Sequence, residues 1–182
     1  MIFRPTAIGG VWLVEPERRV DDRGFFARTW CEAEFRARGL NGRLAQASIS
    51  YSSRRGTLRG LHYQAAPHEE AKLVRCTRGA VFDVVVDLRP GSPTFTQHIS
   101  ARLDADTRLA LYVPEGCAHG FQTLTDDTEV FYQMSAPHVA GAGRGVRWDD
   151  PAFAIPWPAA ERIIAPRDRA YPDFQREAAG VR

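Results

Sequence analysis

Apolar and polar residues alternate with a period of two along most of the chain, which is the pattern of strands with one buried face. Gly, Pro, Asp and Ser gather between the alternating runs and predict turns. One short helix is predicted at residues 31–40, where Gly39 stops the segment CEAEFRARGL. The pattern predicts about ten strands, at residues 10–15, 24–30, 43–52, 57–64, 71–77, 80–89, 94–103, 109–114, 119–124 and 129–135.

Many short strands without crossover helices between them favour an all-β fold. We expect an antiparallel double-sheet jelly roll, that is, a β-sandwich or barrel, with short peripheral helices. The length of 182 residues suits one domain. The sequence therefore predicts a single jelly-roll domain at residues 1–182, with its core at about 10–136 and a C-terminal coil with short helices at about 137–182.

The composition is that of a soluble globular protein, with 44% hydrophobic and 25% charged residues. No apolar run approaches the roughly 18 residues that a membrane-spanning helix needs. The first apolar run ends at Glu15 without a basic leader or a cleavage site, so we expect a cytoplasmic protein. Cys31, Cys76 and Cys117 are odd in number and form no C-x-x-C pair, which disfavours a disulfide framework and a structural zinc site.

The charges give no case for nucleic-acid or membrane partners, since the net charge is only +2. Their composition is unusual, however, because the chain has 23 arginines and a single lysine, Lys72. A genome that favours arginine codons would explain this composition, with Lys72 present by chance. The functional interpretation is that the chemistry at this position needs a compact ammonium, which a guanidinium cannot replace.

Four segments, on predicted strands or at their ends, contain side chains that could take part in catalysis. They supply His62 in TLRGLHYQ, Lys72 in HEEAKLVR, His119 in PEGCAHGF and Tyr132 in VFYQMS. Taken singly, a histidine or tyrosine on a strand is more often a core residue than a functional one. Inward-pointing side chains from different strands can nevertheless meet in the pocket between the sheets of a jelly roll.

The segment PEGCAHGFQTL resembles the P-x-G-x-x-H signature of the cupin jelly rolls. The other cupin signature contains H-x-H, and here the chain reads HYQ, with Gln64 in place of the second histidine. Glutamine is a poor substitute for imidazole as a ligand of a transition metal. We therefore expect a cupin-type barrel without a metal, in which His62 is a free imidazole whose ordinary pKa of about 6.5 suits proton transfer.

Residues 10 to 174 resemble one family of metal-free cupins, the nucleotide-sugar epimerases of the dTDP-4-dehydrorhamnose 3,5-epimerase family. The resemblance rests on long motifs in the right order: DDRGFF, GTLRGLHYQ, KLVRCTRGAVFDVVVDLRPGSPTF, LYVPEGCAHGFQTL, EVFYQ, WDDPAFAIPWP and PRD. It implies an isomerase that inverts C3, C5 or both of a nucleotide-linked 4-keto-6-deoxyhexose, such as the dTDP-sugar of rhamnose-type deoxysugar biosynthesis. It also implies that no cofactor is used and that the protein is a homodimer.

The resemblance assigns roles to the candidate residues. His62 is the base, Asp168 its hydrogen-bonding partner, Tyr132 the acid on the opposite face, and Lys72 the donor to the C4 oxygen. The substrate-binding set that the resemblance implies consists of Arg23, Arg59 and Arg167 at the diphosphate, Phe26 or its neighbour Phe25 at the base, and Gln46, Ser48 and His119. We interpret Asp83 and Asp87, in FDVVVDL, as strand-end or interface charges outside the site.

Several positions depart from the family pattern. Arg28 stands where an acid is usual, Ser48 where an asparagine is common, and Arg167 where a lysine is usual, and a glutamate expected near Gly143 is missing. A reversed charge at residue 28 should affect the recognition of the substrate more strongly than it affects packing. The nucleotide, dTDP, CDP or another, therefore stays open.

Three alternatives also stay open. One is a related ketoisomerase on a nucleotide sugar, which moves protons through an enediol. The others are a metal-dependent cupin and a non-catalytic sugar-binding module.

Overall fold

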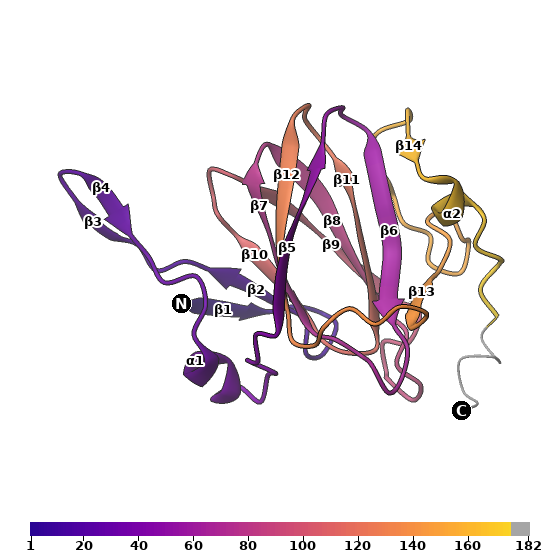
Figure 1. The fold of residues 1–182 in the computed structure, drawn as a ribbon, viewed down its shortest axis with the longest axis horizontal. Coiled ribbons are helices and arrows are strands. Elements are labelled where there is room, and N and C mark those ends of the chain that lie inside the picture. Colours follow the sequence, from indigo (N-terminus) through magenta and orange to yellow (C-terminus); the bar gives the residue numbers. More distant parts are fainter. Residues whose placement is uncertain (176–182) are drawn as a thin grey trace.

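Two antiparallel sheets pack face to face in the computed structural model, which describes residues 1–175 (Figure 1). The predicted C-terminal coil runs on to residue 182, and its residues 176–182 lie outside the described ones. The first sheet has the strand order β1 (Ile2–Pro5), β2 (Trp12–Glu15), β10 (Ala110–Val113), β7 (Lys72–Arg78), β12 (Thr128–Met134) and β5 (Gln46–Ser52). The second has the order β13 (Gly143–Gly145), β6 (Thr57–Gln64), β11 (Cys117–Thr123), β8 (Ala80–Asp87) and β9 (His98–Asp104), and β14 (Ile163–Ile164) pairs in parallel with β6. The all-β double-sheet jelly roll expected from the sequence is confirmed.

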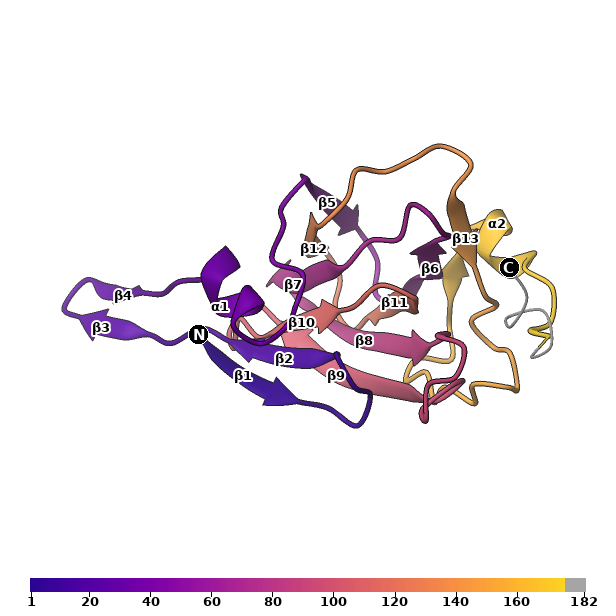
Figure 2. The same cartoon turned by 90° about the horizontal axis from the view of Figure 1, so that it is seen from below.

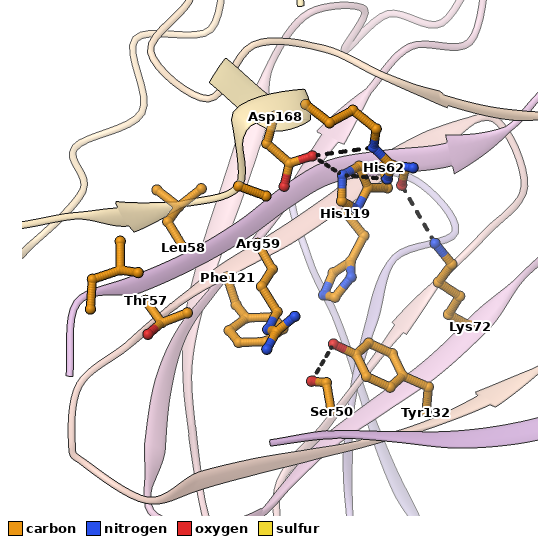
Figure 3. A pocket seen from close by; sticks show the side chains of 13 residues that line it. Ser50, Thr57, Leu58, Arg59, His62, Lys72, His119, Phe121, Tyr132 and Asp168 are labelled. Atoms are coloured by element: carbon orange, nitrogen blue, oxygen red, sulfur yellow. Dashed lines mark hydrogen bonds and ion pairs between the residues drawn. The ribbon is translucent and has the colours of Figure 1, made fainter. Parts of the chain in front are cut away.

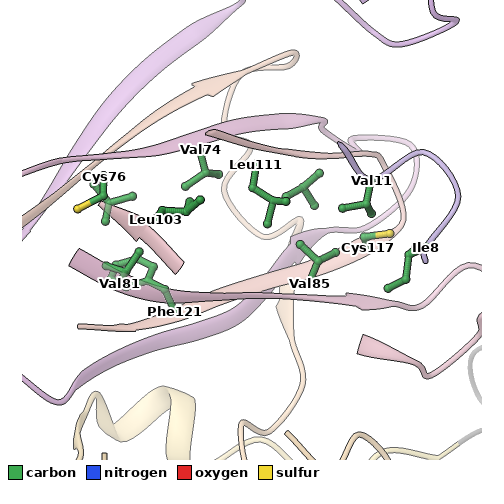
Figure 4. Close-up of a cluster of buried hydrophobic side chains, with 12 residues drawn as sticks. Ile8, Val11, Val74, Cys76, Val81, Val85, Leu103, Leu111, Cys117 and Phe121 are labelled. Carbon is green, nitrogen blue, oxygen red and sulfur yellow. The ribbon is translucent and has the colours of Figure 1, made fainter. Parts of the chain in front are cut away.

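The main core fills the space between the two sheets. Its buried side chains come from the inward faces of both sheets and from the turn before β2 (Figure 4). The cluster comprises Ile8, Val11, Val74, Cys76, Val81, Val85, Leu103, Leu111, Val113, Cys117, Phe121 and Val130. The inward faces of the two sheets thus supply this core, and Cys76 and Cys117 are among its buried residues.

A two-stranded hairpin, β3 (Arg19–Asp21) and β4 (Gly24–Phe26), projects away from the sandwich (Figure 1). The sequence predicted a longer strand at residues 24–30, and this is wrong beyond Phe26. Since β4 pairs with β3 and joins neither large sheet, nothing extends the ladder after the hairpin closes. The short helix α1 (Glu32–Arg36) follows, inside the predicted range, and buries Phe35 against the first sheet.

The strand predicted at residues 94–103 begins only at His98. The segment before it is a chain of turns, because the Ser92 and Thr94 hydroxyls donate to Asp87 at distances of 2.5 and 2.7 Å. Asp87 is the last residue of β8 and is fully buried. Its interpretation as a strand-end charge is therefore confirmed.

Strands β6 and β11 come unusually close where they carry the two candidate histidines. A Cβ at Gly60, which has a φ of +126°, would lie 2.6 Å from Gly120 Cα, so both positions need glycine. His62 and His119 are directly paired across the two strands. The C-terminal segment packs outside β6 and contains the short helix α2 (Pro166–Arg169) (Figure 2). Asp168 of this helix hydrogen-bonds to His62. None of the helices in residues 1–175 is both long and apolar enough to span a membrane.

Candidate active site

A cavity of about 520 Å³ opens between the two sheets at the end that the main core leaves unfilled (Figure 3). Strands of the first sheet form one wall, and β6, β11 and the segment around α2 form the other. The cavity is lined by Ser50, Thr57, Leu58, Arg59, His62, Lys72, His119, Phe121, Tyr132, Ile163, Ala165, Arg167 and Asp168. The four candidate residues of the separate sequence segments are therefore brought together.

His62 and Asp168 form a hydrogen-bonded pair on the second-sheet wall. His62 Nε2 lies 2.7 Å from Asp168 Oδ1, and the Gly60 amide donates to the other carboxylate oxygen at 3.2 Å. The carboxylate is almost fully buried, whereas about a third of the imidazole is exposed to the cavity. Burial lowers the pKa of His62, although the Asp168 carboxylate acts in the opposite direction. At neutral pH the imidazole is therefore unprotonated at one nitrogen and able to accept a proton.

Arg167 lies over this pair. Its Nη2 is 3.3 Å from His62 Nε2, and its Nε is 3.7 Å from Asp168 Oδ1. The guanidinium is largely exposed, so it can also contact a ligand at the mouth of the cavity.

Tyr132 stands on the opposite wall, on β12 of the first sheet (Figure 3). Its hydroxyl lies 3.2 Å from Ser50 Oγ on the neighbouring strand β5. Burial raises the pKa of Tyr132 well above the ordinary value of 10. The phenol therefore keeps its proton at neutral pH and faces the cavity as a proton donor.

His119 pairs with Asp83, an acid that the sequence pattern predicts to lie outside the site. Its Nε2 lies 2.9 and 3.0 Å from the two oxygens of Asp83, which is fully buried in the middle of β8. Burial raises the pKa of the Asp83 carboxyl. The interpretation of Asp83 as a strand-end or interface charge is wrong, because this carboxyl is 0% exposed in the middle of β8 and pairs with a histidine of the cavity wall. The His119 ring also contacts Tyr132 edge to face, with centroids 6.2 Å apart.

Lys72 reaches the cavity from the start of β7. Its Nζ lies 3.4 Å from the carbonyl oxygen of His62 and 3.2 Å from Glu70 Oε1. The ammonium is thus placed between the two walls, close to the strand that carries His62.

Arg59 enters the cavity from β6 and is held by β5. Its Nε donates to Ser52 Oγ at 3.2 Å, and its Nη2 donates to the Tyr51 carbonyl at 2.9 Å. These contacts fix the guanidinium while leaving other N–H groups for an anionic ligand.

Arg23 and Phe26 do not reach this cavity within one chain. They lie on the projecting hairpin, where Phe26 is 73% exposed. Arg23 Nη2 contacts Asp21 at 2.6 Å in the same turn. The neighbouring Arg28 forms an ion pair with Glu34 at 3.0 Å, so its positive charge is partly compensated.

Gln46 and Ser48 lie on the inward face of β5 but do not line the cavity. Gln46 Nε2 donates to Ser48 Oγ at 3.4 Å, and Gln46 Oε1 accepts from the His138 amide at 3.0 Å. Ser50, two residues further on the same face, is the β5 residue that lines the cavity. The period of two could have indicated Ser50, because residues 46, 48 and 50 share a face.

Gln64, the residue that replaces a cupin metal ligand, is buried and occupied by the surrounding loops. Its Nε2 lies within 3.2 Å of the carbonyl oxygens of His68 and Pro137, and its Oε1 accepts from the Val139 amide at 2.8 Å. Among residues 1–175 no group of three or more His, Cys, Asp or Glu side chains could hold a metal ion. Gln64 serves as a structural link between the end of β6 and two loops.

Comparisons with known proteins show similarity over most of the chain. The family model described as dTDP-4-dehydrorhamnose 3,5-epimerase matches residues 5–176. A dTDP-4-dehydrorhamnose 3,5-epimerase of Sinorhizobium fredii is 43% identical over 175 residues, covering 96% of this chain and 90% of that protein.

Two solved structures are similar over almost their whole length. The dTDP-4-dehydrorhamnose 3,5-epimerase of Bacillus anthracis, with TDP and PPi bound, has a TM-score of 0.91 and 39% identity and covers 95% of this chain and 99% of its own. The dTDP-6-deoxy-D-glucose-3,5-epimerase of Legionella pneumophila, in complex with dTDP-4-keto-L-rhamnose, has a TM-score of 0.86 and 32% identity. That match covers 96% of this chain and 98% of the Legionella chain.

Proposed function

Because this chain belongs to the dTDP-4-dehydrorhamnose 3,5-epimerase family, we propose that it inverts C3 and C5 of a dTDP-linked 4-keto-6-deoxyhexose. The reaction moves protons by general base and acid catalysis through an enolate. One observation carries the proposal: an unprotonated imidazole and a protonated phenol stand on opposite walls of the same cavity. Inversion at carbon requires removal of a proton from one face and delivery of a proton to the other.

His62 acts as the base. Asp168 accepts the Nε2 proton, which directs Nδ1 to take the proton from the carbon next to the ketone. The same carboxylate stabilises the imidazolium that forms. Its own position is fixed by the Gly60 amide.

Lys72 stabilises the enolate. Removal of the proton moves negative charge onto the C4 oxygen, and the ammonium on the cavity wall is the donor for it. Tyr132 then gives its proton to the opposite face of the same carbon. His119, held by Asp83, contacts the sugar beside Tyr132.

The remaining predicted residues bind the nucleotide. Arg59 and Arg167 lie on the cavity wall, at positions suited to a diphosphate. Gln46 and Ser48 contact the substrate from β5 after a rearrangement of their mutual hydrogen bond. Arg23 and Phe26 contribute from another copy of the chain.

The active unit is a homodimer in which the hairpin of each copy reaches the cavity of the other. Two exposed features support this arrangement. The hairpin presents Val20 and Phe26 to solvent, and β5, the edge of the first sheet, presents Ile49 and Tyr51. Exposed apolar side chains on a projecting hairpin and on a sheet edge are typical of surfaces that a partner covers.

Mixing two inactive variants tests the shared site. Co-expressed His62→Asn and Arg23→Ala chains with different tags should form mixed dimers in which one cavity carries both defects and the other carries neither. We expect about one quarter of wild-type activity if chains pair at random. Activity no higher than that of the two variants assayed separately would show that each chain builds its own site.

The pH dependence tests the base. Protonated His62 cannot accept a proton, so kcat/KM should fall as the pH drops through its pKa. Since burial lowers this pKa below 6.5, the fall should begin at a lower pH than for an exposed histidine. Asp168→Asn removes the group that favours the imidazolium, so it should move the fall to still lower pH while reducing the maximum rate. The exposed His138→Asn control should leave the profile unchanged, and an unmoved profile in Asp168→Asn would contradict the pairing.

Deuterium exchange tests the function as a whole. Incubation with dTDP-4-keto-6-deoxyglucose in deuterated water should place solvent deuterium at C3 and C5 of an L-configured product, measured by mass spectrometry and NMR. Deuterium at one centre would indicate a single-centre epimerase. Exchange with CDP-linked but not dTDP-linked sugar would reassign the nucleotide, and binding without exchange would indicate a sugar-binding module.

We further place the reaction in the cytoplasm, where thiols stay reduced. The three cysteines are unpaired, and burial raises the pKa of Cys76 to about 11 and that of Cys117 to about 12, so both are unreactive core thiols.

A further inference from the structure

An acid that no predicted role covers lies beside the only lysine of the chain. Glu70 stands two residues before Lys72, in the loop that leads from β6 into β7. Its Oε1 lies 3.2 Å from Lys72 Nζ, and its side chain is 10% exposed while that of Lys72 is 12% exposed. An ion pair this deeply set is less screened by water than a surface pair.

Glu70 is itself held from behind. Gln64 Nε2 lies 3.2 Å from Glu70 Oε2, the oxygen that does not face Lys72, and shares its two N–H donors among this oxygen and the carbonyls of His68 and Pro137. Gln64 is 3% exposed, and its amide oxygen accepts from the Val139 backbone. The carboxylate is therefore fixed between a buried amide on β6 and the ammonium on β7.

Gln64, which contacts Glu70, lies on β6, the strand that also carries the proposed base His62. His62 and Gln64 are two residues apart on β6, so they share one face. Lys72 also donates to the backbone carbonyl of His62. The position of the ammonium is thus tied to that of the imidazole through two routes, one by way of Glu70 and Gln64 and one direct.

The number of N–H donors on Lys72 explains how these contacts would affect catalysis. A lysine ammonium has three N–H donors on a flexible stem with four carbons. Glu70 Oε1 takes one and the His62 carbonyl takes another, which leaves the third for a substrate oxygen. Without Glu70, the stem would be free to rotate and the ammonium would rest on one long contact of 3.4 Å.

We propose that Glu70 is a positioning residue that, fixed by Gln64, holds the Lys72 ammonium in the orientation that meets the C4 oxygen of the substrate. The proposal rests on the proposed function, since it requires an oxygen on which negative charge develops. It also gives a role to Gln64, the glutamine of HYQ: this residue helps to position Lys72, the group that acts on the C4 oxygen.

Kinetics of two Glu70 variants test the proposal. Glu70→Ala should lower kcat by about 10-fold to 100-fold with little change in KM, because misplacing a catalytic group by about 1 Å can cost on the order of 10²-fold. Glu70→Gln keeps an oxygen that can accept from Lys72, so it should recover most of the lost kcat. Glu69→Ala removes the neighbouring exposed acid and should leave kcat unchanged.

A double-mutant cycle separates positioning from a general structural effect. In a Lys72→Met background, Glu70→Ala should cause no further loss of deuterium exchange, because the group that it positions is already gone. An equal loss in both backgrounds, or an unchanged kcat in Glu70→Ala, would overturn the proposal. Should Glu70→Ala fold poorly by its melting temperature, Glu70→Met, which keeps the length of the side chain and removes both acceptor oxygens, replaces it in the same comparison.

The wild-type protein distinguishes failure of this proposal from failure of the proposed function. Turnover of the dTDP-sugar by wild type together with an active Glu70→Ala variant would reject only the role of Glu70. Absence of turnover and of exchange in the wild type would reject the proposed function and this inference with it.

Discussion

Replacing His62 by asparagine is expected to lower kcat by about 10² to 10⁴, the usual contribution of a general base. Asparagine keeps a hydrogen bond to Asp168 possible but has no nitrogen that accepts a proton near neutral pH. Deuterium incorporation should be lost at C3 and C5 together, because the same imidazole removes both protons. The measurement is the rate of exchange in deuterated water, which detects proton abstraction even without net turnover.

Binding and folding provide the controls for this variant. Affinity for dTDP, measured by calorimetry, should stay close to that of the wild type, since His62 contacts the sugar and not the nucleotide in the proposed reaction. His138→Asn, in an exposed loop, should exchange at the wild-type rate. Exchange by His62→Asn within about tenfold of the wild type would assign the base to another group.

Replacing Lys72 by methionine is expected to lower kcat by about 10² to 10³, as does the loss of one donor from an oxyanion hole. Methionine preserves the length and apolar stem of the side chain and removes the charge. KM should change little, because the ammonium acts on charge that develops after binding. Steady-state kinetics with the dTDP-sugar measures both constants.

Lys72→Arg is the informative companion. Arginine keeps the charge but presents a planar fork that is wider than an ammonium, so it should not restore kcat. Arg55→Met removes a cation from an exposed turn and serves as the matched control. Full activity of Lys72→Arg would mean that any cation suffices and that the single lysine of this chain is an accident of codon usage.

Strands were predictable where the apolar run is long and the strand pairs with another strand on each side. The runs that became β6, β7, β8, β11 and β12 were predicted at nearly their observed positions, since each is a run rich in apolar residues and bounded by turn residues. The pattern failed at residues 27–30 and 94–97. There, the backbone has no strand to pair with, or its hydroxyl side chains bind Asp87 instead. Pairing partners are a property of the fold and not of the local sequence.

The site was partly predictable for the same reason. The motifs placed His62, Lys72, His119, Tyr132 and Asp168 together, and the structure gathers all five around one cavity. The role of Asp83 was not predictable, because a period of two does not distinguish the buried middle of a strand from its exposed end. The partnership of Glu70 with Lys72 left no mark in the sequence, since the loop between β6 and β7 has no periodicity that would orient a side chain.

The fold class, the candidate acid and base residues, and the resemblance to the family could all be read from the order of residues. They follow from the local alternation of apolar and polar residues and from motifs that occur along the chain in the order typical of the family. The contacts between these groups could not be read in this way. They include the burial that lowers the pKa of His62 and raises that of Tyr132, the pair of His119 with Asp83, and the exposure of Arg23. These contacts depend on strand register, loop path and desolvation, because each is set by atoms that are distant in sequence and meet only when the chain packs.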